Sequence, residues 1–427
     1  MTSPASQQPG DTLHECPGCG LLQAIPPLAP RVAVTCARCG KVLRRTRPRS
    51  SLRALAMALT SMALYCIAVW SPFLSADILG QRRETTMASL PAAFVENGMW
   101  ELAFVVLATS IVLPLCKIGV VLLTLLGLRT ANPPRWLPAL FRQYQHIGPW
   151  AMVEVFLLGV FVAFTRLGAI ATVQVGIALY ALAGLMLTMV MTDYLIDHEA
   201  VWEEMAERGL VPGACAPATA RLPAGCENCG LVNDLAQGAC CTRCGSGLSR
   251  RRPNSLARTW ALLATAAILY LPANIYPVMT IVRLGSGAPS TILGGVRELF
   301  DAGMWPLALL VLVASVLVPA FKLAGLVFML VETQRGSSRW LRGRTRLHRV
   351  IEFIGRWSMI DVFMLATLVG LVRHGKIASI TPGFGALCFA GVVILTMFAA
   401  IAFDPRLMWD AARRPAPARP GALARPA

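Results

Sequence analysis

An internal repeat constrains the fold of this chain more than any other sequence feature. Residues 98–117 read GMWELAFVVLATSIVLPLCK, and residues 303–322 read GMWPLALLVLVASVLVPAFK. The segment IGPWAMVEVF at 147–156 likewise matches IGRWSMIDVF at 354–363. Because the register between the matching segments changes by only two residues, the sequence predicts one structural module that is present twice.

Each copy of the repeat contains four apolar stretches that are long enough to cross a membrane. A transmembrane helix needs about 20 apolar residues, and 56% of the 427 residues are hydrophobic whereas only 14% are charged. We expect spans at 54–74, 100–127, 148–166, 172–195, 256–280, 304–331, 355–373 and 382–403. The predicted fold is therefore an all-α polytopic membrane protein with two tandem four-helix modules and eight spans.

Two C-x2-C pairs precede each module. The first set has the spacing C-x2-C-x16-C-x2-C and the second C-x2-C-x11-C-x2-C, and their members are Cys16, Cys19, Cys36, Cys39, Cys226, Cys229, Cys241 and Cys244. Four thiolates at such spacing typically surround a structural Zn²⁺ ion, so we expect two small β zinc ribbons. A dithiol redox site and a nucleic-acid finger are the alternatives, and Cys240 is an alternative ligand to Cys241.

The order of these features gives a domain plan. It consists of a disordered tail (1–13), zinc ribbon 1 (14–47), transmembrane module 1 (48–200), a linker (201–222), zinc ribbon 2 (223–250), transmembrane module 2 (251–410) and a second disordered tail (411–427).

The arginines predict the orientation of the chain in the membrane. With eight spans, the arginine-rich segments before each first span, in the loop 332–353 and in the tail all fall on one side. By the positive-inside rule this side is cytoplasmic, so both termini and both ribbons face the cytosol. A cytosolic location also keeps thiolates reduced. The net charge of +17 is then explained by topology and anionic headgroups rather than by nucleic acid.

Charged residues occur inside the predicted spans at equivalent positions of the repeat. Lys117 and Lys322 each follow a proline by three residues, and Glu154 and Asp361 occupy matching positions in the third spans. Because charge inside a membrane is costly, we expect a Lys117–Glu154 pair and a Lys322–Asp361 pair. These pairs form either a proton-coupled or headgroup-binding site or a purely structural ion pair. Alternatively, the lysine side chains extend along the membrane helix until their ammonium groups reach its cytoplasmic interface.

Prolines near the ends of the first spans suggest a second polar feature. Asn274 lies within LPANIYP at 271–277, where a helix broken by proline would line a cavity, or where the span simply ends.

Motifs of common enzyme classes are absent from the sequence. There is no G-x-x-x-x-G-K-[ST] loop, no G-x-S-x-G elbow and no H-E-x-x-H pair. We therefore expect neither ATP hydrolysis nor another catalytic activity.

The tandem ribbons, the repeated GMW segments and the P-x-x-K motifs together resemble the paraquat-inducible protein A family, which includes the A subunit of the lipophilic envelope-spanning tunnel. The resemblance covers roughly residues 14–410. It implies a subunit of the bacterial inner membrane that exchanges phospholipids with a periplasmic tunnel of MCE-domain proteins. Because the sequence has no ATP site, we expect the intramembrane Lys/acid pairs to couple this exchange to the proton gradient. The alternatives are a non-transporting anchor for the tunnel and a membrane thiol redox protein.

Overall fold

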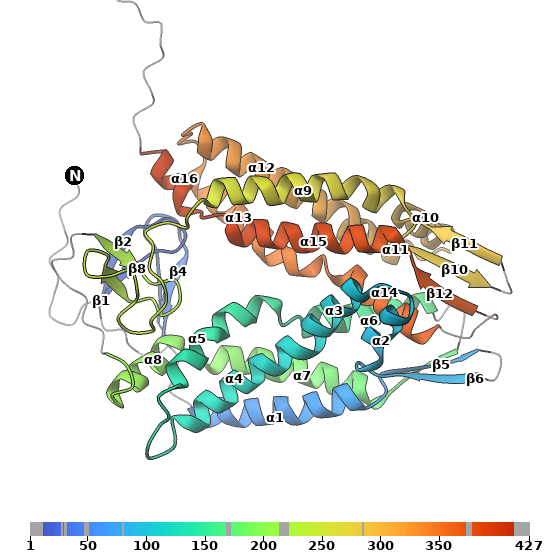
Figure 1. Ribbon diagram of the computed structural model, residues 1–427, viewed down its shortest axis with the longest axis horizontal. Helices are drawn as coiled ribbons and strands as arrows, with labels where there is room; N and C mark the ends of the chain where they lie inside the picture. The colour runs from blue at the N-terminus through green and yellow to red at the C-terminus, as the bar shows by residue number, and fades with distance from the viewer. Residues whose placement is uncertain are drawn as a thin grey trace, which may run out of the picture.

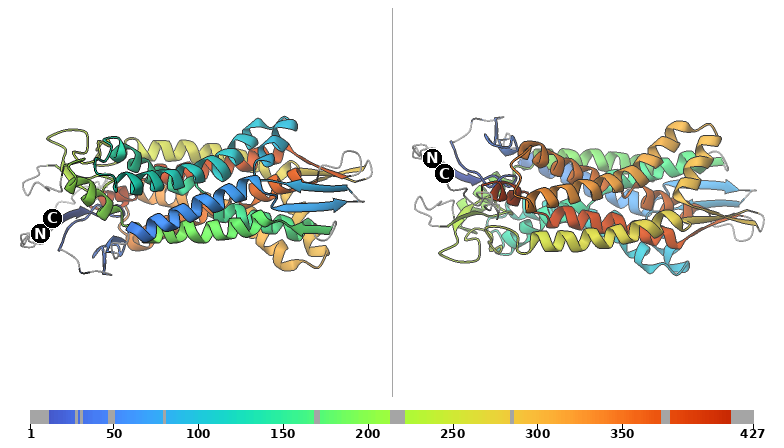
Figure 2. Two further views of the ribbon diagram at one scale, coloured as in Figure 1. Left: turned by 90° about the horizontal axis from the view of Figure 1, so that it is seen from below. Right: turned by 90° about the horizontal axis from the view of Figure 1, so that it is seen from above.

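The computed structural model describes residues 12–26, 29, 32–46, 51–78, 81–167, 172–212, 222–283, 286–372 and 378–413. Most of both predicted tails, as well as Cys215, lies outside these residues. Within the described part of the chain, eight helices are long and apolar enough to cross a membrane, which confirms the predicted number. The helices run side by side, with the ribbons at one end and small β-sheets at the other (Figures 1 and 2).

The two halves of the chain have equivalent helices. Module 1 contains α1 (Ser51–Trp70), α2 (Ser89–Glu96), α3 (Trp100–Val106), η1 (Leu107–Val112), α4 (Leu113–Gly127), α5 (Leu137–Ile147), η2 (Gly148–Trp150), α6 (Val153–Leu167), α7 (Ile177–Leu195) and α8 (His198–Glu207). Module 2 contains α9 (Ser255–Ile275), α10 (Ile292–Asp301), α11 (Trp305–Leu312), η3 (Val313–Leu317), α12 (Val318–Gln334), α13 (Leu341–Trp357), α14 (Ile360–Leu371), α15 (Phe384–Ala402) and α16 (Arg406–Ala411).

The helical segments that contain the third spans begin earlier than the predicted spans. They cover Leu137–Leu167 and Leu341–Leu371, because the amphipathic helices α5 and α13 lead directly into α6 and α14. Each span is interrupted, by η2 in module 1 and around Ser358 in module 2. The first spans are shorter than predicted and end at Trp70 and Ile275. Pro72 and Pro277 follow these ends, whereas Pro272 lies inside the last turn of α9, which continues unbroken through it.

The second span of each module contains a π-helical turn just before its proline. These turns are η1 and η3, and the prolines are Pro114 and Pro319. Proline cannot donate a backbone hydrogen bond, so carbonyls in the preceding turn lose their usual partner. The hydroxyl of Tyr65 donates to the carbonyl of Ile111 at 2.9 Å, and Tyr270 donates to Val316 at 3.1 Å. A tyrosine of the first span therefore stabilises the distorted turn in both modules.

The end opposite the ribbons carries two antiparallel sheets that the sequence analysis did not predict. One has the strand order β6 (Gln81–Thr85), β5 (Leu74–Ile78), β7 (Thr172–Val175), and the other β11 (Ser286–Ser290), β10 (Met279–Arg283), β12 (Ala378–Pro382). In each sheet the outer strands come from the two loops of one module. Each sheet therefore ties the first two spans of its module to the last two. We call this end of the molecule the sheet end and the other the ribbon end.

The modules pack against each other mainly through α6 and α14, which lie at the centre of the molecule (Figure 1). Gly159 permits the close approach, because a Cβ atom there would lie 2.7 Å from the Cβ of Phe363. Phe156 and Phe363 make an edge-to-face contact across the interface at 5.5 Å. The short helix α2 of module 1 also packs on α14. The modules are thus in close contact toward the sheet end.

Candidate functional site

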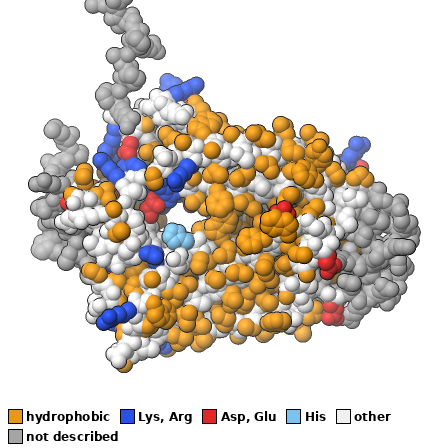
Figure 3. All heavy atoms as spheres, viewed as in Figure 1, with side chains coloured by type: hydrophobic (Ala, Val, Ile, Leu, Met, Phe, Trp, Pro, Cys, Tyr) orange, Lys and Arg blue, Asp and Glu red, His pale blue; other side chains and the backbone are white. Residues whose placement is uncertain are grey.

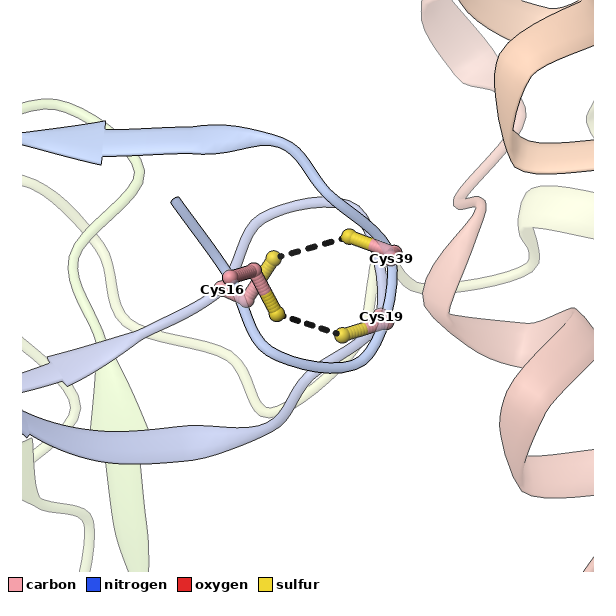
Figure 4. A group of neighbouring side chains, drawn as sticks. Cys16, Cys19 and Cys39 are labelled. Atoms are coloured by element: carbon pink, nitrogen blue, oxygen red, sulfur yellow. Dashed lines mark hydrogen bonds between the residues drawn. The ribbon is translucent and has the colours of Figure 1, made fainter. Parts of the chain in front are cut away.

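The four cysteines before module 1 gather into one cluster. Ribbon 1 consists of the hairpins β1 (Thr12–Glu15) with β2 (Leu22–Ile25) and β3 (Ala33–Thr35) with β4 (Val42–Arg45). The sulfurs of Cys16 and Cys39 lie 3.5 Å apart, as do those of Cys19 and Cys36 (Figure 4). All four sulfurs lie within 4.8 Å of one another and the residues are buried.

The second set of cysteines has the same geometry. Ribbon 2 contains the pair β8 (Pro223–Gly225) and β9 (Val232–Asp234). The Sγ···Sγ distances of Cys226–Cys244 and Cys229–Cys241 are both 3.5 Å. Cys241 belongs to the cluster, whereas Cys240 is exposed and outside it. The structure thus favours Cys241 over Cys240 as the fourth ligand.

The distances fit a metal ion better than a disulfide. A disulfide requires sulfurs about 2.05 Å apart, whereas four sulfurs about 2.3 Å from a tetrahedral metal ion lie about 3.8 Å from one another. The described residues form no disulfide. Each cluster can therefore hold one metal ion.

Backbone turns prepare the thiols for this role. The glycine after each cysteine pair has a φ between 66° and 75°, which suits a tight turn, and these glycines are Gly20, Gly40, Gly230 and Gly245. The hydrogen bond from Cys16, together with the Leu21 backbone and Arg38, lowers the pKa of Cys19 to about 5 despite burial, whereas the same hydrogen bond and burial raise the pKa of Cys16. Within this pair Cys19 therefore favours the thiolate, which is the form that binds metals.

A cleft separates the two modules in the half of the molecule near the ribbons. Its volume is about 530 Å³, and its wall comes from α4, α5, η2, α6, α7 and the start of α8 of module 1 and from α13 and α15 of module 2. Figure 3 shows the hollow between two surfaces rich in apolar side chains, with charged groups and a histidine at its edge. Charged groups from both modules line the cleft, and they are Lys117, Glu154, Asp193, Arg349, Glu352 and Arg356.

The predicted partner of Lys117 is wrong. Its Nζ atom lies 2.6 Å from Oδ2 of Asp193 on α7, and the hydroxyl of Tyr144 donates to Oδ1 of the same carboxylate at 2.5 Å. Glu154 instead faces Arg356 of module 2 at 3.9 Å. The sequence pattern did not suggest Asp193, because this residue has no acidic counterpart in module 2.

The predicted Lys322–Asp361 pair is also wrong. Lys322 is only 1% exposed, and its Nζ atom has no hydrogen-bond partner among the described residues. The register of the repeat explains the difference, because Ala400 occupies the position of Asp193 and Ile351 that of Tyr144. Module 2 therefore has the lysine without the groups that bind it in module 1.

Asp361 lies on the other side of the module interface from Arg166. Both carboxylate oxygens of Asp361 are buried, and no described donor has hydrogen-bond geometry to either of them. Arg166 of module 1 and Ser315 line the same cavity of about 40 Å³, and the charge of Arg166 acts on the carboxylate. This cavity is large enough for about one water molecule.

Asn274 does not line the cleft. It lies in the last turn of α9 at the sheet end, and its side-chain amide donates to the carbonyl of Tyr270 at 2.8 Å.

Comparisons with known proteins agree with this architecture. The family model for Paraquat-inducible protein A matches residues 52–206 and 256–413, so it matches each module once. The chain is 34% identical over 398 residues to the Intermembrane transport protein PqiA of Escherichia coli (strain K12), covering 92% of this chain and 95% of the relative. It is 30% identical over 412 residues to the Lipophilic envelope-spanning tunnel protein A of the same strain, covering 94% and 92%.

A more distant relative is the Probable intermembrane transport protein of Haemophilus influenzae, which is 27% identical over 410 residues and covers 92% of this chain and 94% of the relative. No solved structure matches the chain. The duplicated module, the eight spans and the similarity over nearly the whole length lead to one conclusion: the chain belongs to the paraquat-inducible protein A family.

Proposed function

We propose that this chain is an inner-membrane subunit of an intermembrane lipid transport system, in which the cleft between the modules binds a phospholipid headgroup. The cleft carries this proposal. Its charged groups lie between apolar helix surfaces, so a lipid has a polar place for its headgroup and an apolar surface for its acyl chains. The names of the relatives, which refer to intermembrane transport and to an envelope-spanning tunnel, support the same role.

The orientation and partner complete the proposal. The ribbon end faces the cytoplasm, and the sheet end meets an MCE-domain tunnel protein in the periplasm. The exposed thiol of Cys240 at the ribbon end tests this orientation. A membrane-impermeant maleimide should label it in inverted vesicles but not in intact spheroplasts. Labelling in spheroplasts would place the ribbons outside.

The two cysteine clusters bind Zn²⁺ in this proposal. Four thiolates leave no open ligand position, so the metal has a structural role. Elemental analysis of the purified chain should find two zinc ions per chain.

Lipid transfer is tested with the charge pair that crosses the cleft. The chain and its tunnel partner are reconstituted in liposomes with a fluorescent phospholipid, and the lipid that reaches the tunnel is measured. Arg356→Gln should reduce transfer because it removes the partner of Glu154. Arg335→Gln, in the surface Arg335–Glu332 pair at the ribbon end of α12, is the matched control and should have no effect. Equal transfer without this chain would instead indicate a non-transporting anchor.

Proton coupling is a separate part of the proposal and has its own test. Lys322 and Asp361 are the buried charged groups that would bind and release protons. Lys322→Ala and Asp361→Ala should each abolish complementation of an envelope-defective strain at equal protein level. Full activity in both variants would rule out an essential role for these residues.

A further inference from the structure

The metal-binding core of each ribbon packs on the module of the other half of the chain. The cysteines of ribbon 1 share a hydrophobic cluster with Leu326 and Met329 of α12 and with Trp409 of α16. The cysteines of ribbon 2 share a different cluster with Leu55 of α1 and Trp202 of α8. Ribbon 1 therefore contacts module 2, and ribbon 2 contacts module 1. We call these the crossed ribbon contacts.

Two arginines at equivalent positions of the repeat make the same contact. Arg349 of α13 donates to the carbonyl of Cys39 at 3.2 Å, and Arg142 of α5 donates to the carbonyl of Cys244 at 3.4 Å. Cys39 and Cys244 are the last cysteines of their clusters. A metal ion that fixes these cysteines thus also fixes the carbonyls that the arginines bind.

Further contacts strengthen the attachment of ribbon 1 to module 2. Arg342 of α13 donates to the carbonyl of Arg38 at 2.9 Å. The Arg38 guanidinium in turn lies over the ring of Trp409, 4.5 Å from its centroid. Both contacts involve the segment between the last two cysteines of the cluster.

Ribbon 1 also stays attached to its own half. Arg44, on the last strand of the ribbon, pairs with Glu199 at 2.5 Å and with Glu203 at 2.9 Å, both on α8 of module 1. The ribbon consequently bridges the two modules at the ribbon end, beside the cleft that Arg349 lines.

From this geometry we infer that the ribbons are crossed braces. Each metal-bound ribbon holds the module of the other half in place. Arg142 and Arg349 are the positioning residues, because they connect helices α5 and α13 to the cysteine clusters. The inference concerns the assembly of this chain and does not depend on which ligand the cleft binds.

The test measures cysteine exposure at each ribbon separately in the full-length, metal-loaded chain. A maleimide is added with a chelator, and the alkylation rate of each ribbon is followed by peptide mass spectrometry. Arg349→Gln should increase alkylation of ribbon 1 about tenfold, as expected for the loss of one charge-assisted hydrogen bond, and leave ribbon 2 unchanged. Arg142→Gln should affect ribbon 2 alone.

Two control variants separate this effect from general unfolding. Arg346→Gln removes an exposed arginine one turn from Arg349 and should change neither ribbon. Arg349→Lys keeps a donor for the Cys39 carbonyl and should restore part of the protection. Faster alkylation of both ribbons, or of the ribbon in the same half as the mutated arginine, would overturn the inference.

A distance measurement tests the consequence for the modules. Spin labels are attached through noncanonical amino acids at the exposed positions 130 and 339, in equivalent loops of the two modules at the ribbon end. Removal of the metal should lengthen or broaden the distance distribution. An unchanged distribution in the metal-free protein would show that the ribbons do not hold the modules together.

Discussion

Replacing each buried lysine by methionine should have opposite effects on stability in the two modules. Lys322 is 1% exposed and has no hydrogen-bond partner among the described residues. An unpaired charge near the centre of a membrane helix costs about 2.5–3.5 kcal/mol. Methionine has a similar length and no charge, so Lys322→Met should raise the free energy of unfolding by about 2–3 kcal/mol.

Lys117→Met should instead destabilise the protein. Lys117 is 8% exposed and forms a 2.6 Å ion pair with Asp193. Loss of a charged hydrogen bond costs about 1.5–3 kcal/mol. The Asp193 side chain is 42% exposed, so water compensates part of the loss, and we expect a value near the lower limit.

Thermal unfolding in lipid nanodiscs, followed by tryptophan fluorescence, measures both effects. A change of 1 kcal/mol shifts the midpoint by roughly 2–4 °C for a domain of this size, so Lys322→Met should raise it by about 4–12 °C. Lys117→Met should lower it by about 3–6 °C. A decrease in both variants would refute the reasoning, because it would mean that Lys322 has a stabilising partner.

Three further predictions follow from the described contacts. Asp404→Asn should lower stability by about 1.5–3 kcal/mol because it removes the buried carboxylate that accepts hydrogen bonds from Arg406, which keeps Glu227 and Glu15 as partners. Burial opposes ionisation of Asp404, but the hydrogen bonds and charge of Arg406 outweigh it and lower the pKa of Asp404. This stabilisation is complete above the unfolded-state pKa of about 3.9 and is lost only as the pH falls through the lower folded-state value, so the difference between variant and wild type in chemical denaturation should be constant from pH 5 to 8. Gly159→Leu should cost at least about 1–3 kcal/mol in thermal unfolding because it separates the modules, whereas Gly119→Leu, which has open space around it, should not. Cys229→Ser should halve the bound metal measured by elemental analysis, and retention of two metal ions per chain would exclude this cysteine as a ligand.

The sequence alone was sufficient for the repeat, the number of spans and the two cysteine clusters. Span number follows from apolar length, because a bilayer requires about 20 apolar residues per helix. The thiol clusters follow from spacing, since two C-x2-C pairs bring four sulfurs together through local turns. Such features depend on residues that are close in sequence, so the tertiary arrangement was not needed to predict them.

The partners of the buried charges were decided by the tertiary structure. The sequence pattern suggested Glu154 for Lys117 because both positions recur in the repeat, but α7 brings Asp193 closer. That residue has no acidic equivalent in module 2, so symmetry could not reveal it. Which side chains meet across helices depends on helix rotation and packing, and these are not encoded in spacing along one helix.

The cleft, the sheets and the crossed ribbon contacts likewise became visible only in the folded chain. Each sheet joins strands from two loops of a module, and the paired residues lie about 100 positions apart in sequence. Each ribbon packs its cysteines on the module of the other half of the chain, and ribbon 1 does so although module 1 follows it directly in sequence. Local sequence determined what each segment becomes, because helices, turns and thiol clusters form from nearby residues. The packing of distant segments determined which surfaces meet, and the cleft and its charges result from that packing.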